Sequence, residues 1–139
     1  MSKAVFVTQK DIVNRTPMGG NVDPSKYMNF AYVTEEIELQ GVLGTQLYNK
    51  LKTDVVNGTL SGVYLTLVNS YIKDFVSFYT AAEYLPFATF SINNGGVYSR
   101  EPENGTSASS EQVNSLSQRL RDRAEHYGRR MYDYLVANN

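Results

Sequence analysis

Three arginines and one histidine recur at helical spacing near the C-terminal end of the sequence. Arg119, Arg123, His126 and Arg130 are separated by four, three and four residues. Because an α-helix turns about 100° per residue, this spacing predicts one basic strip along a helix. A guanidinium group binds carboxylates or phosphates through paired N–H donors, so the strip suits acids on a neighbouring subunit or nucleic-acid phosphate. The alternative is a solvated helix whose arginine stems cover the edge of the core.

The residue types that enzymes use are sparse. There is one histidine and no cysteine, so we expect no two-histidine or thiolate metal site, no disulfide and no cysteine nucleophile. Neither PMGGNV nor NNGGVY has the Lys-Ser/Thr of a phosphate-binding loop. We place the clustered acids Glu35, Glu36 and Glu38 on a solvated helix face rather than in an acid–base pair. We therefore expect no catalytic residues, no cofactor and no enzymatic activity; an enzyme with its site between subunits is the least favoured alternative.

Length, charge and hydropathy further narrow the class of protein. The 139 residues suggest a single domain spanning 1–139, large enough to bury a core. The formal net charge of -1 argues against a general binder of nucleic acid or anionic membrane, because such proteins usually carry a basic excess. The most apolar stretch, residues 63–85, has Lys73 and Asp74 at its centre, which predicts a buried helix and no membrane span.

Helical periodicity predicts an all-α fold, with a bundle of about three to four helices. Apolar residues recur at intervals of three and four over four segments. Gly41 and Gly44 are expected to interrupt the first of them, whose apolar face consists of Tyr27, Phe30, Ala31, Thr34 and Ile37. Asp23-Pro24 is a typical helix start, and Pro86 is expected to end or kink the third helix. Ser109 with Gln112 three residues later predicts a capping box for the last helix. The expected helices cover about residues 24–39, 45–56, 61–85 and 109–137.

The last helix has a second stripe besides the basic one. Apolar residues form a continuous row about 90° around the helix from the arginines. Acidic residues occupy the far side, at Asp122, Glu125 and Asp133. The expected apolar row consists of Val113, Leu116, Leu120, Ala124, Tyr127, Met131 and Tyr134.

Two segments fall outside the helical pattern. Residues 1–22 contain AVFV and then PMGG, which predicts an extended arm or short strand followed by a loop. Residues 91–109 form a long loop in which NNGG favours a short hairpin between ATFSI and VYS. Loops longer than ~12–15 residues are uncommon in compact domains. The loop is a disordered insertion, a lid, or a segment that orders against another subunit; we favour the last interpretation.

Several segments together resemble a known family. The arm and first helix are followed by LQGVLGTQLYNKL at 39–51, YIKDFVSFYTAAEYLPF at 71–87, NNGGV at 93–97 and a long last helix. In these features the chain resembles the small head–tail connector, or adaptor, proteins of tailed bacteriophages. It is most similar in style to neck-ring proteins of phages of Bacteroidetes hosts, including the crAss-like group. The tract EPENGTSAS at 101–109 departs from the family pattern.

The resemblance implies a function and a set of partners. It implies an all-α subunit of a closed homo-oligomeric ring, commonly twelve-fold, that docks beneath the portal protein in the virion neck. It further implies contacts with other neck or tail proteins, packaged DNA passing through the lumen without sequence-specific binding, and assembly in the bacterial host cytoplasm. The alternative function is a small helical DNA-binding or regulatory accessory protein that uses the basic strip.

The residues expected at subunit or portal contacts come from the loop and the basic strip. For Arg123→Glu we expect loss of ring assembly with a folded monomer. The expected interface residues are Asn93, Asn94, Gly95, Gly96, Val97, Tyr98, Arg100, Arg119, Arg123 and Arg130.

Overall fold

The computed structural model describes residues 4–88, 90–93, 96–99 and 110–138. The prediction of an all-α fold is confirmed: the described chain forms five continuous helices, more than the three to four expected, and one short hairpin. Two of the five contain a π-helical segment, η2 or η3, and run through it without a break. The elements are α1 (Gln9–Arg15), η1 (Pro24–Lys26), α2 (Met28–Thr34), η2 (Glu35–Leu39), α3 (Gln40–Leu43), α4 (Thr45–Asn57), α5 (Gly62–Leu67), η3 (Val68–Ile72), α6 (Lys73–Ala88), β1 (Phe90–Asn93), β2 (Gly96–Ser99) and α7 (Ser110–Ala137).

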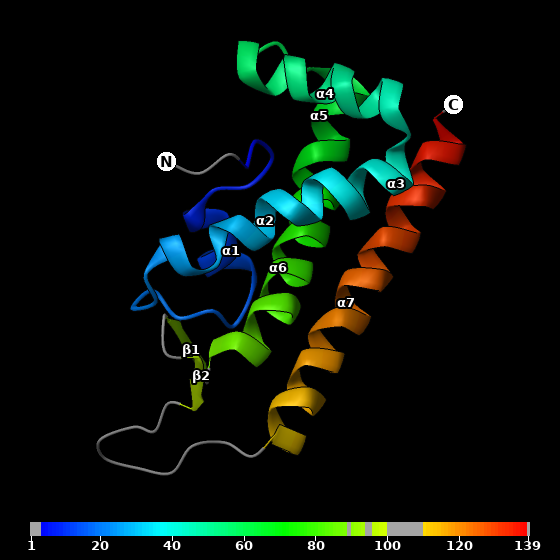
Figure 1. The fold of residues 1–139 in the computed structure, drawn as a ribbon. Helices are drawn as coiled ribbons and strands as arrows, with labels where there is room; N and C mark the ends of the chain where they lie inside the picture. Colours follow the sequence, from blue (N-terminus) through cyan, green and yellow to red (C-terminus); the bar gives the residue numbers. More distant parts are fainter. Residues whose placement is uncertain (1–3, 89, 94–95, 100–109, 139) are drawn as a thin grey trace.

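The antiparallel pair α6 and α7 forms the centre of the fold (Figure 1). The helix made of α2, η2 and α3 packs against α6, and α4 crosses the end of the bundle near the C-terminus (Figure 1). Gly128 permits the close approach of the central pair, because a Cβ there would lie 2.9 Å from the ring of Phe75. The helices therefore share one core, to which every helix contributes buried residues.

Pro86 was expected to end or kink its helix, and the first of these expectations is wrong. Helix α6 continues through Pro86 to Ala88 instead of ending there. Proline has no N–H to donate to the carbonyl four residues earlier, which is that of Ala82. The buried Ser117 hydroxyl of α7 donates to this carbonyl at 2.7 Å. A hydrogen bond between the two central helices thus satisfies an acceptor that the proline leaves free.

The π-helical segment η2 changes which residues face the core. Helical spacing predicted Ile37 on the apolar face, but 62% of Ile37 is exposed. A π-helical turn contains an extra residue and shifts the register of the side chains that follow. Glu35 and Leu39, at the two ends of η2, are buried instead. Simple periodicity cannot predict such a shift.

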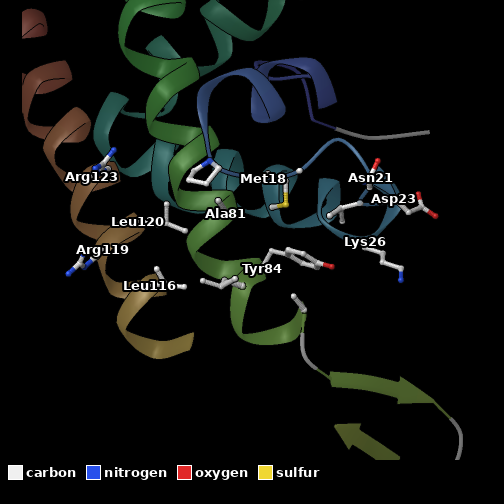
Figure 2. Close-up of a pocket in the computed structure, with 15 residues that line it drawn as sticks. Met18, Asn21, Asp23, Lys26, Ala81, Tyr84, Leu116, Arg119, Leu120 and Arg123 are labelled. Carbon is white, nitrogen blue, oxygen red and sulfur yellow. The ribbon is translucent and has the colours of Figure 1, made fainter. Parts of the chain in front are cut away.

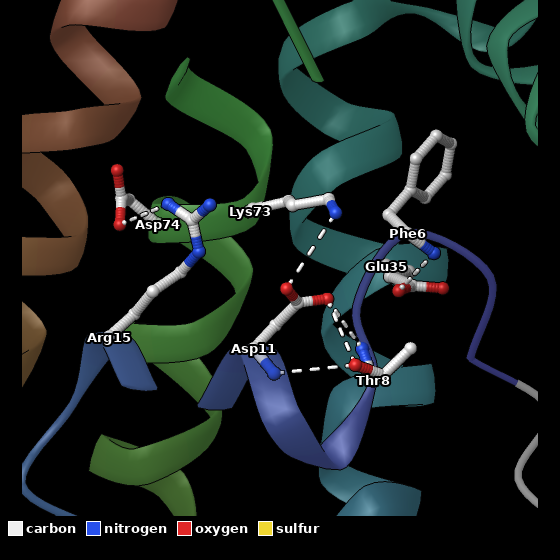
Figure 3. Close-up of polar contacts among 7 residues, drawn as sticks. All are labelled: Phe6, Thr8, Asp11, Arg15, Glu35, Lys73 and Asp74. Atoms are coloured by element: carbon white, nitrogen blue, oxygen red, sulfur yellow. Dashed lines mark hydrogen bonds and ion pairs between the residues drawn. The ribbon is translucent and has the colours of Figure 1, made fainter. Parts of the chain in front are cut away.

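The N-terminal segment is partly helical, which corrects the expectation of an extended arm and loop over residues 1–22. Residues Gln9–Arg15 form α1, and a capping box explains its start. The Thr8 hydroxyl accepts from the Asp11 N–H at 3.3 Å, and the Asp11 carboxylate accepts from the Thr8 N–H at 2.9 Å (Figure 3). The box has Asp where Glu or Gln is more usual, so the sequence signal is weak.

Other local predictions are confirmed. The Asp23 side chain accepts from the Ser25 N–H at 3.0 Å and caps η1. Gly44 separates α3 from α4 with φ of 82°, a conformation that favours glycine. The predicted hairpin pairs β1 with β2 in antiparallel register, with Ile92 opposite Val97. The predicted cap at Ser109 lies outside the described residues.

Candidate interaction surface

An apolar groove lies between the N-terminal loop, the end of α6 and the first half of α7 (Figure 2). Its volume is about 850 Å³. The floor and walls are mostly apolar, and charged residues stand along both sides. We call this the basic groove, and it is lined by Pro17, Met18, Gly19, Asn21, Val22, Asp23, Lys26, Ala81, Tyr84, Leu85, Ala88, Leu116, Arg119, Leu120 and Arg123.

Two of the predicted strip residues lie at this groove. Arg119 and Arg123 are exposed, one turn apart on α7, and line the same wall. Neither forms an ion pair with any residue in the described part of the chain. Lys26 lines the groove from η1, where Asp23 is its neighbour. The groove therefore offers unpaired guanidinium groups beside an apolar surface.

The apolar row of α7 is buried or half-buried as predicted at six of its seven positions, and Leu116 is the exception. Leu116 was expected in the core, but 51% of it is exposed and it lines the basic groove. Ser117 takes the buried position one residue later, because its hydroxyl bonds to the Ala82 carbonyl on α6. Val113, at the start of the row, is buried as expected. A polar residue thus occupies a core position that periodicity assigned to a leucine.

The other end of the basic strip has different surroundings. The Arg130 guanidinium lies over the Tyr71 ring, 5.8 Å from its centroid. This places the Arg130 side chain against η3 and away from the groove that Arg119 and Arg123 line. His126 is exposed, and its ring meets that of the neighbouring Tyr127 edge-on at 5.7 Å. The strip is therefore divided between two environments.

The hairpin residues form a second predicted group. The backbone of β1 and β2 places Asn93 opposite Gly96 and Ser91 opposite Tyr98. The hairpin follows the end of α6 and projects beyond it, below the basic groove (Figures 1 and 2). The predicted contact residues in β2 are Gly96, Val97 and Tyr98, whereas Asn94, Gly95 and Arg100 lie outside the described residues.

A hollow on the opposite flank of α7 has acidic character. Its volume is about 680 Å³, and it lies between α3, α6 and the second half of α7. Burial raises the pKa of the Tyr79 hydroxyl here, and the carboxylates of Glu38 and Glu125 raise it further. We call this surface the acidic face, and it is lined by Glu38, Gly41, Val42, Phe75, Tyr79, Glu125, Gly128, Arg129, Tyr132 and Asp133.

Sequence reasoning missed the role of Glu35. It was expected on a solvated helix face, but only 1% of it is exposed. Its carboxylate accepts from the backbone N–H groups of Val5 at 2.8 Å and Phe6 at 3.0 Å (Figure 3). Burial raises the pKa of Glu35 to about 7, although these hydrogen bonds and Lys52 act in the opposite direction. The only sequence signal for this contact was the apolar run AVFV, because a buried extended segment needs a partner within the chain for its N–H groups.

The described residues show few features of a metal centre or a membrane protein. No group of three or more His, Cys, Asp or Glu side chains in the described ranges is placed to hold a metal ion. Across the same part of the chain, no helix has both the length and the apolar character needed to cross a bilayer.

The fold and surfaces define an all-α protein with a basic groove, an acidic face and a hairpin between α6 and α7. Residues 39–139 match the model of a family of unknown function, DUF6712. The chain belongs to this family, because the match covers well over half of its length. Neither the curated proteins nor the solved structures contain a significant match to the chain.

Proposed function

We propose that the chain is a structural virion protein, a head–tail connector subunit that forms an oligomeric ring below the portal of a tailed bacteriophage. The ring extends the DNA channel and provides a platform for further neck and tail proteins. Packaged DNA passes through its lumen without sequence-specific contacts. The subunit has a mechanical role and no catalytic one.

The observation that carries this proposal is the hairpin at the end of the central helix pair. It projects beyond α6, and its two strands pair only with each other among the described residues (Figure 1). A two-stranded ribbon is marginally stable alone, so it gains most from a surface that it packs on or a strand that it adds. A neighbouring subunit or the portal protein supplies that surface in the proposed ring.

Two further features support the proposal. The chain resembles connector proteins in its segment order and in the motifs of residues 39–51, 71–87 and 93–97. Arg119 and Arg123 are unpaired within the described chain, as expected of residues that complete their contacts on another molecule. Rings arise when one surface of a subunit binds a different surface of the next and the rotation closes.

Electron microscopy tests the proposal directly. The purified protein is imaged alone and after mixing with intact and tail-less heads of a phage that encodes it. We expect rings, or added density beneath the portal that fixes the symmetry. A matched variant, with residues 90–99 replaced one for one by Gly and Ser, is expected to add no such density.

The opposite result has a clear meaning. A monodisperse monomer that leaves the heads unchanged would contradict the connector function. Salt-dependent binding of DNA would then favour the accessory-protein alternative, because binding through phosphates weakens steeply as salt rises.

A further inference from the structure

The two flanks of α7 carry opposite charge. The basic groove has a formal charge of +2, because it is lined by three basic residues, Arg119, Arg123 and Lys26, and by one acidic residue, Asp23. The acidic face has a formal charge of -2, because it is lined by three acidic residues, Glu38, Glu125 and Asp133, and by one basic residue, Arg129. The two surfaces therefore carry formal charges of equal size and opposite sign, although the whole chain has a net charge of only -1.

The two surfaces also face different directions. At about 100° per residue, the groove-lining positions 116–123 and the hollow-lining positions 125–133 lie on opposite sides of the α7 axis. They are also displaced along the axis, since the first set occupies the N-terminal half of the helix and the second the C-terminal half. One copy can therefore use both surfaces at once.

The acidic face offers an apolar anchor that suits the groove. Tyr132 lines this face and exposes 60% of its surface, and Ile37, beside Glu38, exposes 62%. A tyrosine provides a large apolar ring with a polar tip, which makes it a frequent anchor at interfaces. The groove presents exposed Leu116 as a complementary apolar contact.

We propose that the basic groove of one copy binds the acidic face of a second copy, with Tyr132 of that copy in the groove. This inference rests on the proposed ring and names the surfaces that join its neighbours. Arg119, Arg123 and Lys26 meet the carboxylates of the adjacent copy, which fixes the direction and register of the pairing. A two-fold dimer through the groove would bring like charges together, so the contact runs head to tail.

Complementary charge reversal tests this pairing in the full-length protein. The variant Arg119→Glu/Arg123→Glu has two acidic surfaces, and the variant Glu125→Lys/Asp133→Lys has two basic ones. We expect each variant alone to self-associate roughly a hundred-fold more weakly than the wild type. A mixture of the two is expected to recover association, because every groove then meets a face of opposite charge. Sedimentation velocity over a range of concentrations measures both effects.

A matched control separates the groove from general charge effects. Lys10→Glu/Lys50→Glu changes the net charge as much as the groove variant but alters exposed residues outside both surfaces. We expect this control to associate like the wild type. Circular dichroism checks that all three variants remain helical, so that loss of association is not loss of folding.

Carbodiimide cross-linking identifies the contact residues. The reagent joins a lysine amine to a carboxylate in direct contact, and mixing unlabelled with ¹⁵N-labelled protein distinguishes links between copies from links within one. We expect Lys26 to link to Glu38, Glu125 or Asp133 of another copy. Association without these links, or unaffected by the reversals, would overturn the pairing. A wild-type protein that stays monomeric at every concentration would overturn it too.

The two proposals fail in different ways. If density appears beneath the portal but the groove variant still assembles there, the connector function stands and the proposed interface is wrong. If copies pair through the groove and leave phage heads unchanged, the interface stands and the connector function is wrong.

Discussion

The N-terminal arm and the β-hairpin are both short segments attached to the same helical bundle, but the bundle holds them differently. The arm, defined here as residues 4–15, is fixed by side chains of its own chain, with Phe6, Val7 and Ile12 in the core. The hairpin, formed by β1 and β2, projects from the end of α6 (Figure 1). One segment is completed within the subunit, whereas the other, in the proposed ring, is completed outside it.

Polar anchors account for much of this difference. The buried Glu35 carboxylate holds the backbone of Val5 and Phe6, and two ion pairs tie α1 to the start of α6 (Figure 3). Extended backbone has unpaired N–H groups, and a buried carboxylate can accept two of them without a partner strand. An arm anchored in this way is part of the fold, and its removal should cost stability.

The largest expected effect comes from removing the apolar anchor of the arm. We expect Phe6→Ala to lower the free energy of unfolding by about 3–5 kcal/mol, because it leaves a cavity beside the Tyr48 ring 5.8 Å away. Urea denaturation followed by circular dichroism measures the change. Val56→Ala, at a site that is 71% exposed, is the control and should change stability by less than about 0.5 kcal/mol. A small effect at Phe6 would show that the arm is not part of the core.

The next effect depends on pH. The folded-state pKa of Glu35 is raised from 4.5 to about 7, so folding favours its protonated form. Its contribution is therefore fully favourable below about pH 4.5 and is lost as pH rises through about 7. Between these limits we expect the wild type to lose about 2–3 kcal/mol of stability that a Glu35→Gln variant does not lose.

This prediction is tested by comparing how steeply the free energy of unfolding changes with pH in the two proteins, rather than by comparing their absolute stabilities. Glutamine has one acceptor oxygen for two N–H groups, so Glu35→Gln is expected to be less stable than the wild type in acid. The measurement is chemical denaturation of both proteins at several pH values from 4.5 to 8. Tyr48 interacts with Glu35, and burial together with the hydrogen bond to Glu36 raises the pKa of the Tyr48 hydroxyl, away from this range. Parallel pH profiles would contradict the prediction.

A smaller effect is expected at the ion pair between α1 and α6. The Arg15 guanidinium lies 3.0 Å from the Asp74 carboxylate, and both side chains are partly buried. We expect a coupling energy of up to about 1 kcal/mol in a double-mutant cycle of Arg15→Gln and Asp74→Asn. The coupling should decrease at high salt. A cycle with Lys10→Gln in place of Arg15→Gln serves as the control and should show none.

The sequence predicted the helices and the hairpin better than it predicted the surfaces. Periodicity located α4 and α7, and glycines marked the limits of α4, because these are local properties of the chain. The π-helical segment η2 broke the periodic pattern, so Ile37 became exposed and Glu35 became buried. Whether an acid lies in solvent or under an arm depends on a segment about 30 positions away in the chain, and no local pattern contains that information.

The predicted basic strip shows the same limit. Spacing placed Arg119, Arg123 and Arg130 on one side of α7, and all three are exposed. The spacing did not show that Arg119 and Arg123 flank a groove whose opposite wall includes Met18 and Lys26. Part of that wall comes from the PMGG segment, for which the sequence predicted only a loop. Charge pattern along one helix can therefore suggest an interface, but its shape depends on what packs beside the helix.

The smallest expected effect on stability is at the hairpin, where we expect the largest effect on assembly. Replacing residues 90–99 one for one by Gly and Ser keeps the length of the connection between α6 and α7, so the entropy of loop closure changes little. Since an isolated two-stranded ribbon is at best marginally stable, we expect the free energy of unfolding to change by less than about 0.5 kcal/mol. Phe6→Ala should do the reverse: it weakens the subunit but leaves the hairpin free to make contacts. Urea denaturation combined with electron microscopy of head mixtures measures both properties for each variant. A hairpin variant that unfolds at much lower urea would show that the hairpin, like the arm, is completed within its own subunit.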